Sequence, residues 1–371
     1  MSFFILSEPE YGTSNWHRSI MNGLIAEKQQ KRLSLFSLNS IEELPHYSID
    51  DKDAIFLVGN DSEWIDDITA TCEKVFDNRV IVLGNHDSHP YSRRYSVVSS
   101  DIYSEVETLY AYLKYYGCDR IAMYGINPES TSDSFKKASF LSCGASEEDF
   151  FFNASNLAEC FAHFAEKSDS YDGVICVNDY AAISLVMHLK DREKLFITSC
   201  GGRMLANFFS PSITHTQSDY CAFGRAGIDL CRLLQKNSTI NSINICLASK
   251  FVPGETTNFL PLVNKPVYET GYKTNVSINK SNFFYADSET REMMKLEALL
   301  NTCSEIDLLI LEDVIRNETY SRIAEKFFIS TNGLQYKLKN WFDLCGVRSK
   351  SEFIDMLRKF KISKTNYDNL S

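Results

Sequence analysis

Between residues 330 and 339 the chain gathers hydroxyl, amide and amine side chains. The amide of Gln335 can form two hydrogen bonds with an adenine edge, and the amine of Lys337 can bind the acceptors of guanine. Hydroxyls at the start of a helix, such as that of Ser330, are suited to phosphate groups. This chemistry predicts contact with double-stranded DNA, with Gln335 and Lys337 at the base edges. The predicted contact residues are Ser330, Thr331, Asn332, Gln335, Tyr336, Lys337 and Lys339.

No combination of residues predicts catalysis. His86 and His89 in "GNHDSHP" are three positions apart, which is weak spacing for a metal site because the other histidines are dispersed. Neither "YGINPES" (124–130) nor "SCGGRM" (199–204) has the glycine and lysine pattern of a phosphate-binding loop. We therefore expect a binding protein and not an enzyme, with no cofactor and no metal.

Charge is distributed unevenly along the 371-residue chain. The net charge is −11, which argues against nucleic-acid binding by the protein as a whole. Between Ser330 and Lys364, however, eight lysines and arginines stand against three carboxylates, a local charge of +5. This asymmetry predicts either a basic contact surface on an acidic body or a solvated helix face.

Cysteine usage and the apolar runs predict a cytoplasmic location. The eleven cysteines include no C-x-x-C pair, which favours reduced thiols over disulfides or a zinc site. No run reaches the roughly 18 apolar residues that cross a membrane. The start "MSFFILSEPEYG" lacks the basic region of a signal peptide, so we expect a first strand there.

The elements that position these residues alternate in type up to about residue 265. Short apolar runs are separated by segments of helical length such as 104–117, 156–167 and 223–236. This order predicts an α/β fold with parallel sheets. Ligands bind such sheets at the carboxyl ends of the strands, so the residues that follow each run are candidates for a site. The predicted strands are 3–6, 54–58, 79–83, 120–125, 173–177, 195–199 and 243–248.

The last quarter of the chain is predicted to be all helical. The segment 288–300 starts with a serine and acidic residues, which suits a helix N-terminus, and it has an apolar face. It bridges domains, forms part of a dimer contact, or packs on its own domain. Helices over 304–317, 319–328 and 332–346 follow, with a fourth after Gly346. Two of these, joined by the turn 329–331, have the arrangement of a helix-turn-helix. The buried stripe of the third helix is predicted to be Leu334, Leu338, Trp341 and Phe342.

Four pieces of the first 260 residues resemble, in order, the ligand-binding domain of lactose/galactose-repressor-type (LacI/GalR) regulators. They are "YSVVSSDIYSEVETLYAYLKYYGCDRIAMYG", "YDGVICVNDYAAISLVMHLK", "PSITHTQSDYCAFGRAGIDLCRLL" and "FVPGETT". The resemblance implies a type I periplasmic-binding-protein-like fold, in which a small molecule binds between two lobes joined by three crossovers. The implied crossovers lie near Ser99–Asp101, Thr214–Gln217 and Lys250–Val252.

The same resemblance implies ligand contacts in the cleft. The implied ligand-binding residues are Tyr11, Trp16, His17, Asp101 and Asp179. Trp16 can equally pack at a lobe edge, and Asp101 and Asp179 can equally cap helices. The arginine and aspartate that grip sugars in family members are absent, since Thr131 and the run 199–202 occupy their places.

The segment 319–347 resembles the LuxR-type (GerE-like) four-helix DNA-binding domain. The matching positions include Ile323-Ala324, Ile329-Ser330 and Gly346-Val347. The chain departs from that pattern at Gly333, Lys337 and Leu344.

Together these observations predict a ligand-responsive DNA-binding transcription regulator. We expect it to act as a homodimer whose small-molecule effector, a sugar or related metabolite, modulates operator binding. The alternative is a sensor whose helical bundle contacts a protein partner. The predicted boundaries are 1–262 for the ligand-binding domain, 263–300 for a linker and connecting helix, and 301–371 for the helix-turn-helix domain. Lobe 1 spans about 1–100 and 217–250, and lobe 2 about 102–214 and 252–262.

Overall fold

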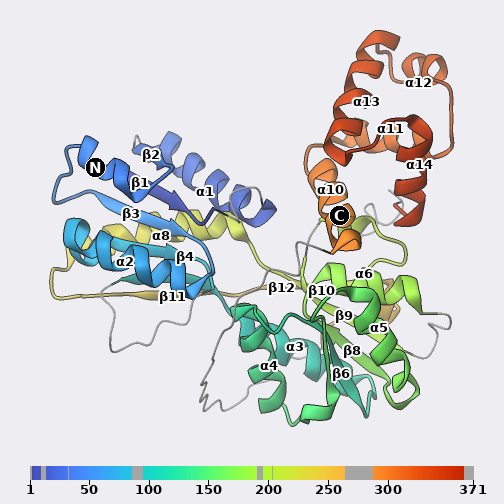
Figure 1. Cartoon of the computed structure of the whole chain (residues 1–371), viewed down its shortest axis with the longest axis horizontal. Coiled ribbons are helices and arrows are strands. Elements are labelled where there is room, and N and C mark those ends of the chain that lie inside the picture. The colour runs from blue at the N-terminus through green and yellow to red at the C-terminus, as the bar shows by residue number, and fades with distance from the viewer. Residues whose placement is uncertain are drawn as a thin grey trace.

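The computed structural model contains two α/β lobes and a C-terminal group of helices (Figure 1). The structure describes residues 2–9, 14–31, 33–85, 95–189, 195–202, 204–263 and 287–362. Most of the segment between 263 and the last five helices, the histidine pair at 86 and 89, and Tyr11 lie outside these ranges.

Lobe 1 is built on a six-stranded sheet in which every pairing is parallel. Its strands, in spatial order, are β11 (Asn244–Leu247), β5 (Ser96–Ser100), β4 (Val80–Leu83), β3 (Ala54–Val58), β1 (Ser2–Ser7) and β2 (Ser34–Leu38). Every residue of β3, "AIFLV", is buried, as expected for a strand covered on both faces. Helices α1 (Asn15–Lys31) and α8 (Tyr220–Lys236) cover one face, and α2 (Ser62–Phe76) covers the other.

Lobe 2 has a second six-stranded sheet, parallel except for one antiparallel edge pair. Its strands are β12 (Lys250–Val252), β10 (Thr214–Gln217), β9 (Phe196–Gly201), β8 (Gly173–Cys176), β6 (Ile121–Ile126) and β7 (Phe150–Phe152). Its helices are α3 (Ile102–Tyr115), α4 (Thr131–Ser142), α5 (Leu157–Ala165), α6 (Asp179–His188) and α7 (Met204–Phe208). Short 3-10 helices lie at Ile41–His46, Asp77–Arg79, Glu147–Asp149, Ser168–Ser170 and Glu255–Thr257.

The chain passes between the two sheets three times. It leaves lobe 1 after β5, returns between β10 and α8, and leaves again between β11 and β12. Both β10 and β12 belong to the second sheet, so the passages fall at 218–219 and 248–249. Each of these two passages contains a serine, Ser218 or Ser249, that bonds to α3.

The seven strands predicted from apolar runs are confirmed, whereas five other strands of the described residues do not correspond to a predicted run. The predicted runs correspond to β1, β3, β4, β6, β8, β9 and β11. The strands without a predicted apolar run are β2, β5, β7, β10 and β12, which are short, polar or at the edge of a sheet. In β10, "THTQ", threonine and histidine side chains are buried inside the lobe, so no apolar run marks the strand.

The C-terminal unit consists of five helices, α10–α14. They are α10 (Ser288–Leu300), α11 (Glu305–Ile315), α12 (Tyr320–Lys326), α13 (Thr331–Cys345) and α14 (Lys350–Lys359). Ser330 caps α13 by accepting a hydrogen bond from the Gly333 amide at 3.0 Å, and Gly346 ends the helix at a φ of 68°. In the predicted stripe Leu334, Leu338 and Trp341 are buried and Phe342 is half-buried.

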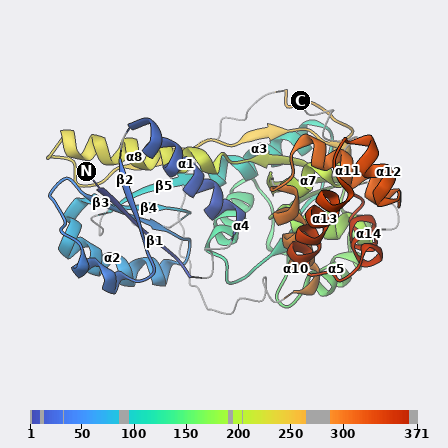
Figure 2. The ribbon, with the colours of Figure 1, turned by 90° about the horizontal axis from the view of Figure 1, so that it is seen from above.

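The C-terminal unit and lobe 2 share one continuous apolar core. Helix α10 packs against α6 and α7 of the lobe and against α13 of the unit. Its Met293, Leu296, Leu299 and Leu300 are at most 1% exposed, and burial of each side chain contributes about 1.5–3 kcal/mol. Both views show the unit on the side of lobe 2, away from α2 (Figures 1 and 2). The unit is therefore held on lobe 2 by a packed interface.

Candidate functional site

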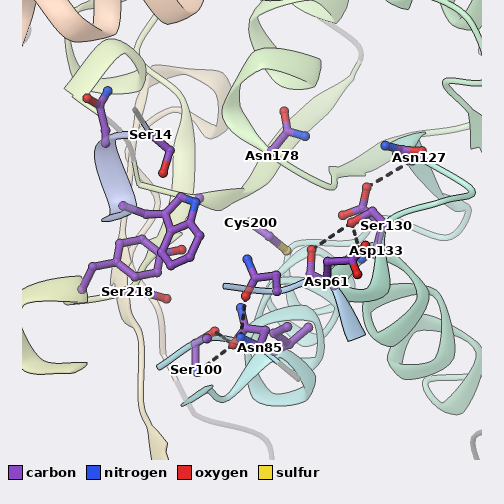
Figure 3. A pocket seen from close by; sticks show the side chains of 18 of the residues that line it. Ser14, Asp61, Asn85, Ser100, Asn127, Ser130, Asp133, Asn178, Cys200 and Ser218 are labelled. Carbon is purple, nitrogen blue, oxygen red and sulfur yellow. Dashed lines mark hydrogen bonds between the residues drawn. The ribbon is translucent and has the colours of Figure 1, made fainter. Parts of the chain in front are cut away.

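A cavity of about 630 Å³ lies between the two lobes. Figure 3 shows polar side chains from both lobes converging on it. Asn60, Asn85, Asn127, Asn178 and Cys200 line it, and each lies at the carboxyl end of a strand or just beyond. The cavity is thus placed where parallel sheets bind ligands.

On the lobe 1 side, hydrogen bonds link the ends of four strands. Glu8 Oε2 accepts from the backbone amides of Asn60 and Asp61, at 2.9 and 3.1 Å. Asn60 Oδ1 accepts from the backbone amide of Asn85 at 2.7 Å. Asn85 Oδ1 in turn accepts from the amide and hydroxyl of Ser100, at 2.9 and 3.0 Å. This network fixes the side chains of the wall before any ligand binds.

Aromatic side chains give lobe 1 an apolar surface facing the cavity. Trp16 and Trp64 both line it, as does Tyr220, whose ring centre lies 6.3 Å from that of Trp16. Trp16 is 9% exposed and also belongs to the core beneath α1. Ring faces of this kind can cover a flat molecule or the apolar face of a sugar.

On the lobe 2 side, a buried ion pair faces the cavity. Lys136 Nζ lies 2.9 Å from Asp133 Oδ1 and donates to the Val177 carbonyl at 2.8 Å. Asp133 Oδ2 accepts from the Asn127 amide at 3.0 Å. Burial disfavours the charged form of Lys136, but Asp133 outweighs it and holds the pKa of the amine above its ordinary value.

Glu105 joins the cavity to the crossovers. It lies in the first turn of α3, directly after the first crossover, and it lines the cavity while only 7% exposed. Its Oε1 accepts from Ser218 at 2.8 Å and also from Ser249, which stand in the second and third passages. Burial raises the pKa of Glu105, and the two hydroxyls oppose that rise only in part. One carboxylate therefore ties together all three connections between the lobes.

The ionisable groups around the cavity are mostly acidic. Among the described lining residues, one ammonium, that of Lys136, faces five carboxylates. The carboxylates are Glu8, Asp61, Glu105, Glu129 and Asp133. Because Asp133 already pairs with Lys136, the described wall holds no second cation that could receive an anionic ligand.

The residues implied by resemblance lie in different places. Trp16 lines the cavity, whereas His17 bonds to Ser7 Oγ at 2.7 Å and is not among its lining residues. Asp101 caps α3 by accepting from the Ser104 amide at 3.0 Å. Asp179 is fully buried behind the cavity wall, where it accepts from the Ser199 hydroxyl. The cap of α6 is not Asp179 but Asn178, which accepts from the Ala181 amide at 3.0 Å.

Several lining residues were not singled out from sequence. Asn60, Asn127 and Asn178 follow the apolar runs of 54–58, 120–125 and 173–177 within three residues, so the strand-end rule points to them. Trp64 and Glu105 carry no such signal, because each lies on a helix whose docking brings it to the cavity.

The outer face of α13 presents most of the predicted DNA contacts to solvent. Asn332, Gln335, Tyr336 and Lys339 are exposed, and the turn before the helix exposes Phe328 to 97%. Lys337 is different, because its Nζ lies 2.6 Å from Asp307 Oδ1 on α11 and 5.8 Å from the ring centre of Trp341. Lys337 is thus held by its own domain, and Lys339 is the lysine on the open face.

Five cations of the C-terminal helices, Arg316, Arg322, Lys326, Lys337 and Lys359, form ion pairs within the unit. Between Ser304 and Ile362, ten lysines and arginines stand against nine aspartates and glutamates. Lys326 lies 2.7 Å from Asp313, and Arg322 lies 3.1 Å from Glu318. Among the cations after residue 330, Lys337 pairs with Asp307 of α11 and Lys359 with Glu292 of α10, and the net charge over residues 304–362 is only +1.

The described residues hold no group of three potential metal ligands, and no described helix is long and apolar enough to cross a membrane.

Comparison with known structures places the two lobes in a recognised fold. A LacI family regulator from Enterococcus faecium with bound ribose matches with a TM-score of 0.54 and 17% identity, over 70% of this chain and 100% of that one. One from Weissella paramesenteroides with bound sucrose gives 0.53 and 16%, over 70% and 100%. One from Silicibacter pomeroyi gives 0.54 and 17%, over 69% and 99%.

No family model matches the chain, and no curated protein matches it. The likeness to the solved regulators is one of fold. The chain accordingly has the two-lobed periplasmic-binding-protein-like architecture, followed by an all-helical region.

Proposed function

We propose that the chain is a ligand-responsive transcription regulator, in which a small molecule in the interlobe cavity modulates DNA binding by α12 and α13. The observation that carries the proposal is the joint presence of a preformed cavity, lined by polar and aromatic side chains, and a solvent-facing α13 in one packed body. The structural neighbours named as regulators with bound sugars support the sensing half.

The DNA-reading half rests on the helix-turn-helix arrangement and on its resemblance to LuxR-type readers. Helices α12 and α13 are joined by the short turn 327–330, and the outer face of α13 carries amide and amine donors suited to base edges and phosphates. We assign Gln335 to a base edge, and Asn332, Tyr336 and Lys339 to its surroundings. Such a protein would act in the cytoplasm as a homodimer that reads two half-sites.

DNA binding is tested by selecting duplexes from a random pool with the full-length protein at low ionic strength. Affinity of the selected duplex is then measured by fluorescence anisotropy across a salt series. The Gln335→Ala/Lys339→Ala variant should lose sequence preference, and its logarithmic salt slope should fall by about one. Arg291→Ala, which removes an exposed cation from α10, is the matched control and should leave both unchanged.

Two observations favour a second function, contact with a protein partner. The cations of α11–α13 are largely paired internally, and two aromatic side chains are exposed, Phe328 just after α12 to 97% and Tyr336 on α13 to 70%. A selection that enriches no duplex, with a folded protein, would favour this second function over the first.

A further inference from the structure

Helix α10 supplies part of the wall of the interlobe cavity. Met294 and Ala298 line it together with Trp16 and Tyr220 of lobe 1. These two residues are four positions apart and thus lie on one face of the helix. Both are half-buried, unlike Met293 and the leucines on the other faces of α10. Two residues of the C-terminal unit, which lies outside both lobes, therefore face the space where a ligand would bind.

A second face of α10 is fixed to lobe 2. Glu297, only 2% exposed, accepts hydrogen bonds from the first amides of α7, at 3.0 Å from Met204 and 2.6 Å from Leu205. Near the start of α10, Glu289 accepts from the Ser184 hydroxyl of α6 at 2.8 Å. The two carboxylates hold both ends of the helix on the lobe.

A third face of α10 contacts the helices that carry the proposed reading surface. It packs on α13, and Glu292 forms an ion pair of 2.5 Å with Lys359 of α14. The Lys295 amine lies against Gly346, the residue that ends α13, since a Cβ there would come within 2.9 Å of it. A displacement of α10 would thus reach α13 through direct packing.

We propose that Met294 and Ala298 are effector-contacting residues, so that occupancy of the cavity acts directly on the C-terminal unit through α10. The inference rests on the proposed sensing role of the cavity and adds the route of regulation. An occupant that contacts Trp16 and Met294 together bridges lobe 1 to the C-terminal unit. Such an occupant can change the position of the C-terminal unit only if it binds one arrangement of α10 relative to lobe 1 more tightly than another.

The test uses a side chain as the occupant, so it needs no identified ligand. Ala298→Trp places an indole in the cavity from α10. Arg291→Trp places the same group on an exposed part of the same helix and is the control. Amide hydrogen–deuterium exchange of the full-length chain is measured for both variants and the wild type.

We expect Ala298→Trp to change exchange by about fivefold or more, the lower end of usual coupling between sites, both at the lobe 1 wall and in α12–α13. Arg291→Trp should change neither. Exchange that changes only within α10 and lobe 2, or nowhere, would overturn the proposal. If Ala298→Trp does not fold, Met294→Ala, which enlarges the cavity, should change exchange in the same two regions, and its failure to do so is equally decisive. The measurement involves no DNA, so its outcome is independent of whether α13 reads a duplex.

Discussion

Removing the charge of Glu105 should change how the stability of the protein depends on pH. This carboxylate is buried and accepts hydroxyl hydrogen bonds from Ser218 and Ser249. Each bond to a charged acceptor contributes about 1.5–3 kcal/mol, and burying the charge costs several kcal/mol in return. Because burial raises the pKa of Glu105, the desolvation cost is the larger of the two for the charged form.

The direction of the pH dependence of stability follows from the raised pKa of Glu105. In acid, below the ordinary glutamate pKa of 4.5, Glu105 is protonated in the folded and unfolded chain, and its favourable contribution is fully present. As the pH rises through the raised pKa that Glu105 has in the folded protein, that contribution is lost. Glu105→Gln keeps an acceptor without the charge, so its stability relative to wild type should increase with pH, by on the order of 1 kcal/mol. Glu105→Ala removes the acceptor that the two hydroxyls share. Because these hydroxyls lie 2.9 Å apart, one can still donate to the other, so one donor is left unpaired and the variant should lose about 1–3 kcal/mol.

Urea unfolding of both variants is followed by tryptophan fluorescence from about pH 4 to pH 8. Glu325→Gln, which neutralises an exposed carboxylate on α12, is the control and should track wild type throughout. The reasoning would be refuted if the gain in unfolding free energy of Glu105→Gln over wild type were independent of pH or largest in acid. Such a result would mean that the crossover hydrogen bonds and not burial dominate the energetics of this carboxylate.

Further predictions concern the C-terminal unit, lobe 2 and the effector. Leu338→Ala, at a site 1% exposed, should lower the unfolding free energy by about 2–5 kcal/mol in urea titrations, and a loss below about 1 kcal/mol would contradict its core position. Gly125→Ala should cost more than about 1 kcal/mol, since φ is 83° and a Cβ would lie 2.5 Å from the Ala181 Cβ; an unchanged melting temperature would argue against this backbone. Burial opposes ionisation of Asp307, but hydrogen bonds from Lys337 and from Ser304, which caps α11, outweigh it and lower the pKa of Asp307. Asp307→Asn should therefore destabilise by about 1 kcal/mol at neutral pH, and the difference should vanish as the pH falls below 3.8; a difference that persists in acid would exclude the ion pair as its cause. In thermal-shift titrations glucose 6-phosphate should stabilise less than glucose, because the described cavity wall has five carboxylates and one ammonium; the reverse order would contradict the charge argument.

The sequence predicts those parts of the fold that depend on local patterns. Continuous apolar runs such as 54–58 mark strands buried on both faces, and the asparagines that follow these runs reach the cavity. Strand β10 escapes prediction because its threonines and histidine are buried by tertiary packing, and Thr214 bonds there to the distant Thr257 at 2.6 Å. Strands such as 54–58 can be predicted from their local apolar pattern, whereas a strand such as β10 forms because of partners that are distant in the sequence.

The candidate site depends more strongly on tertiary contacts. The base-edge role predicted for Lys337 takes no account of Asp307, thirty residues earlier on another helix, which holds the amine at 2.6 Å. The approach of Met294 to the cavity depends on how α10 docks on α6 and α7, and a helical pattern over 288–300 carries no information about that docking. Helix existence is a local property, whereas the partner of each helix face is not.

The bond from Glu297 to the start of α7 also has a consequence for how the chain is made. The α7 amides at Met204 and Leu205 precede their acceptor by 93 and 92 residues. During synthesis β12, the last strand of lobe 2 among the described residues, leaves the ribosome well before α10 does. Until α10 arrives, α6 and α7 lack the apolar partner that packs on them in the folded protein. The core of the second lobe is therefore completed by residues from the last quarter of the chain. The C-terminal unit could not be replaced by another domain in evolution without repacking the lobe on which it lies.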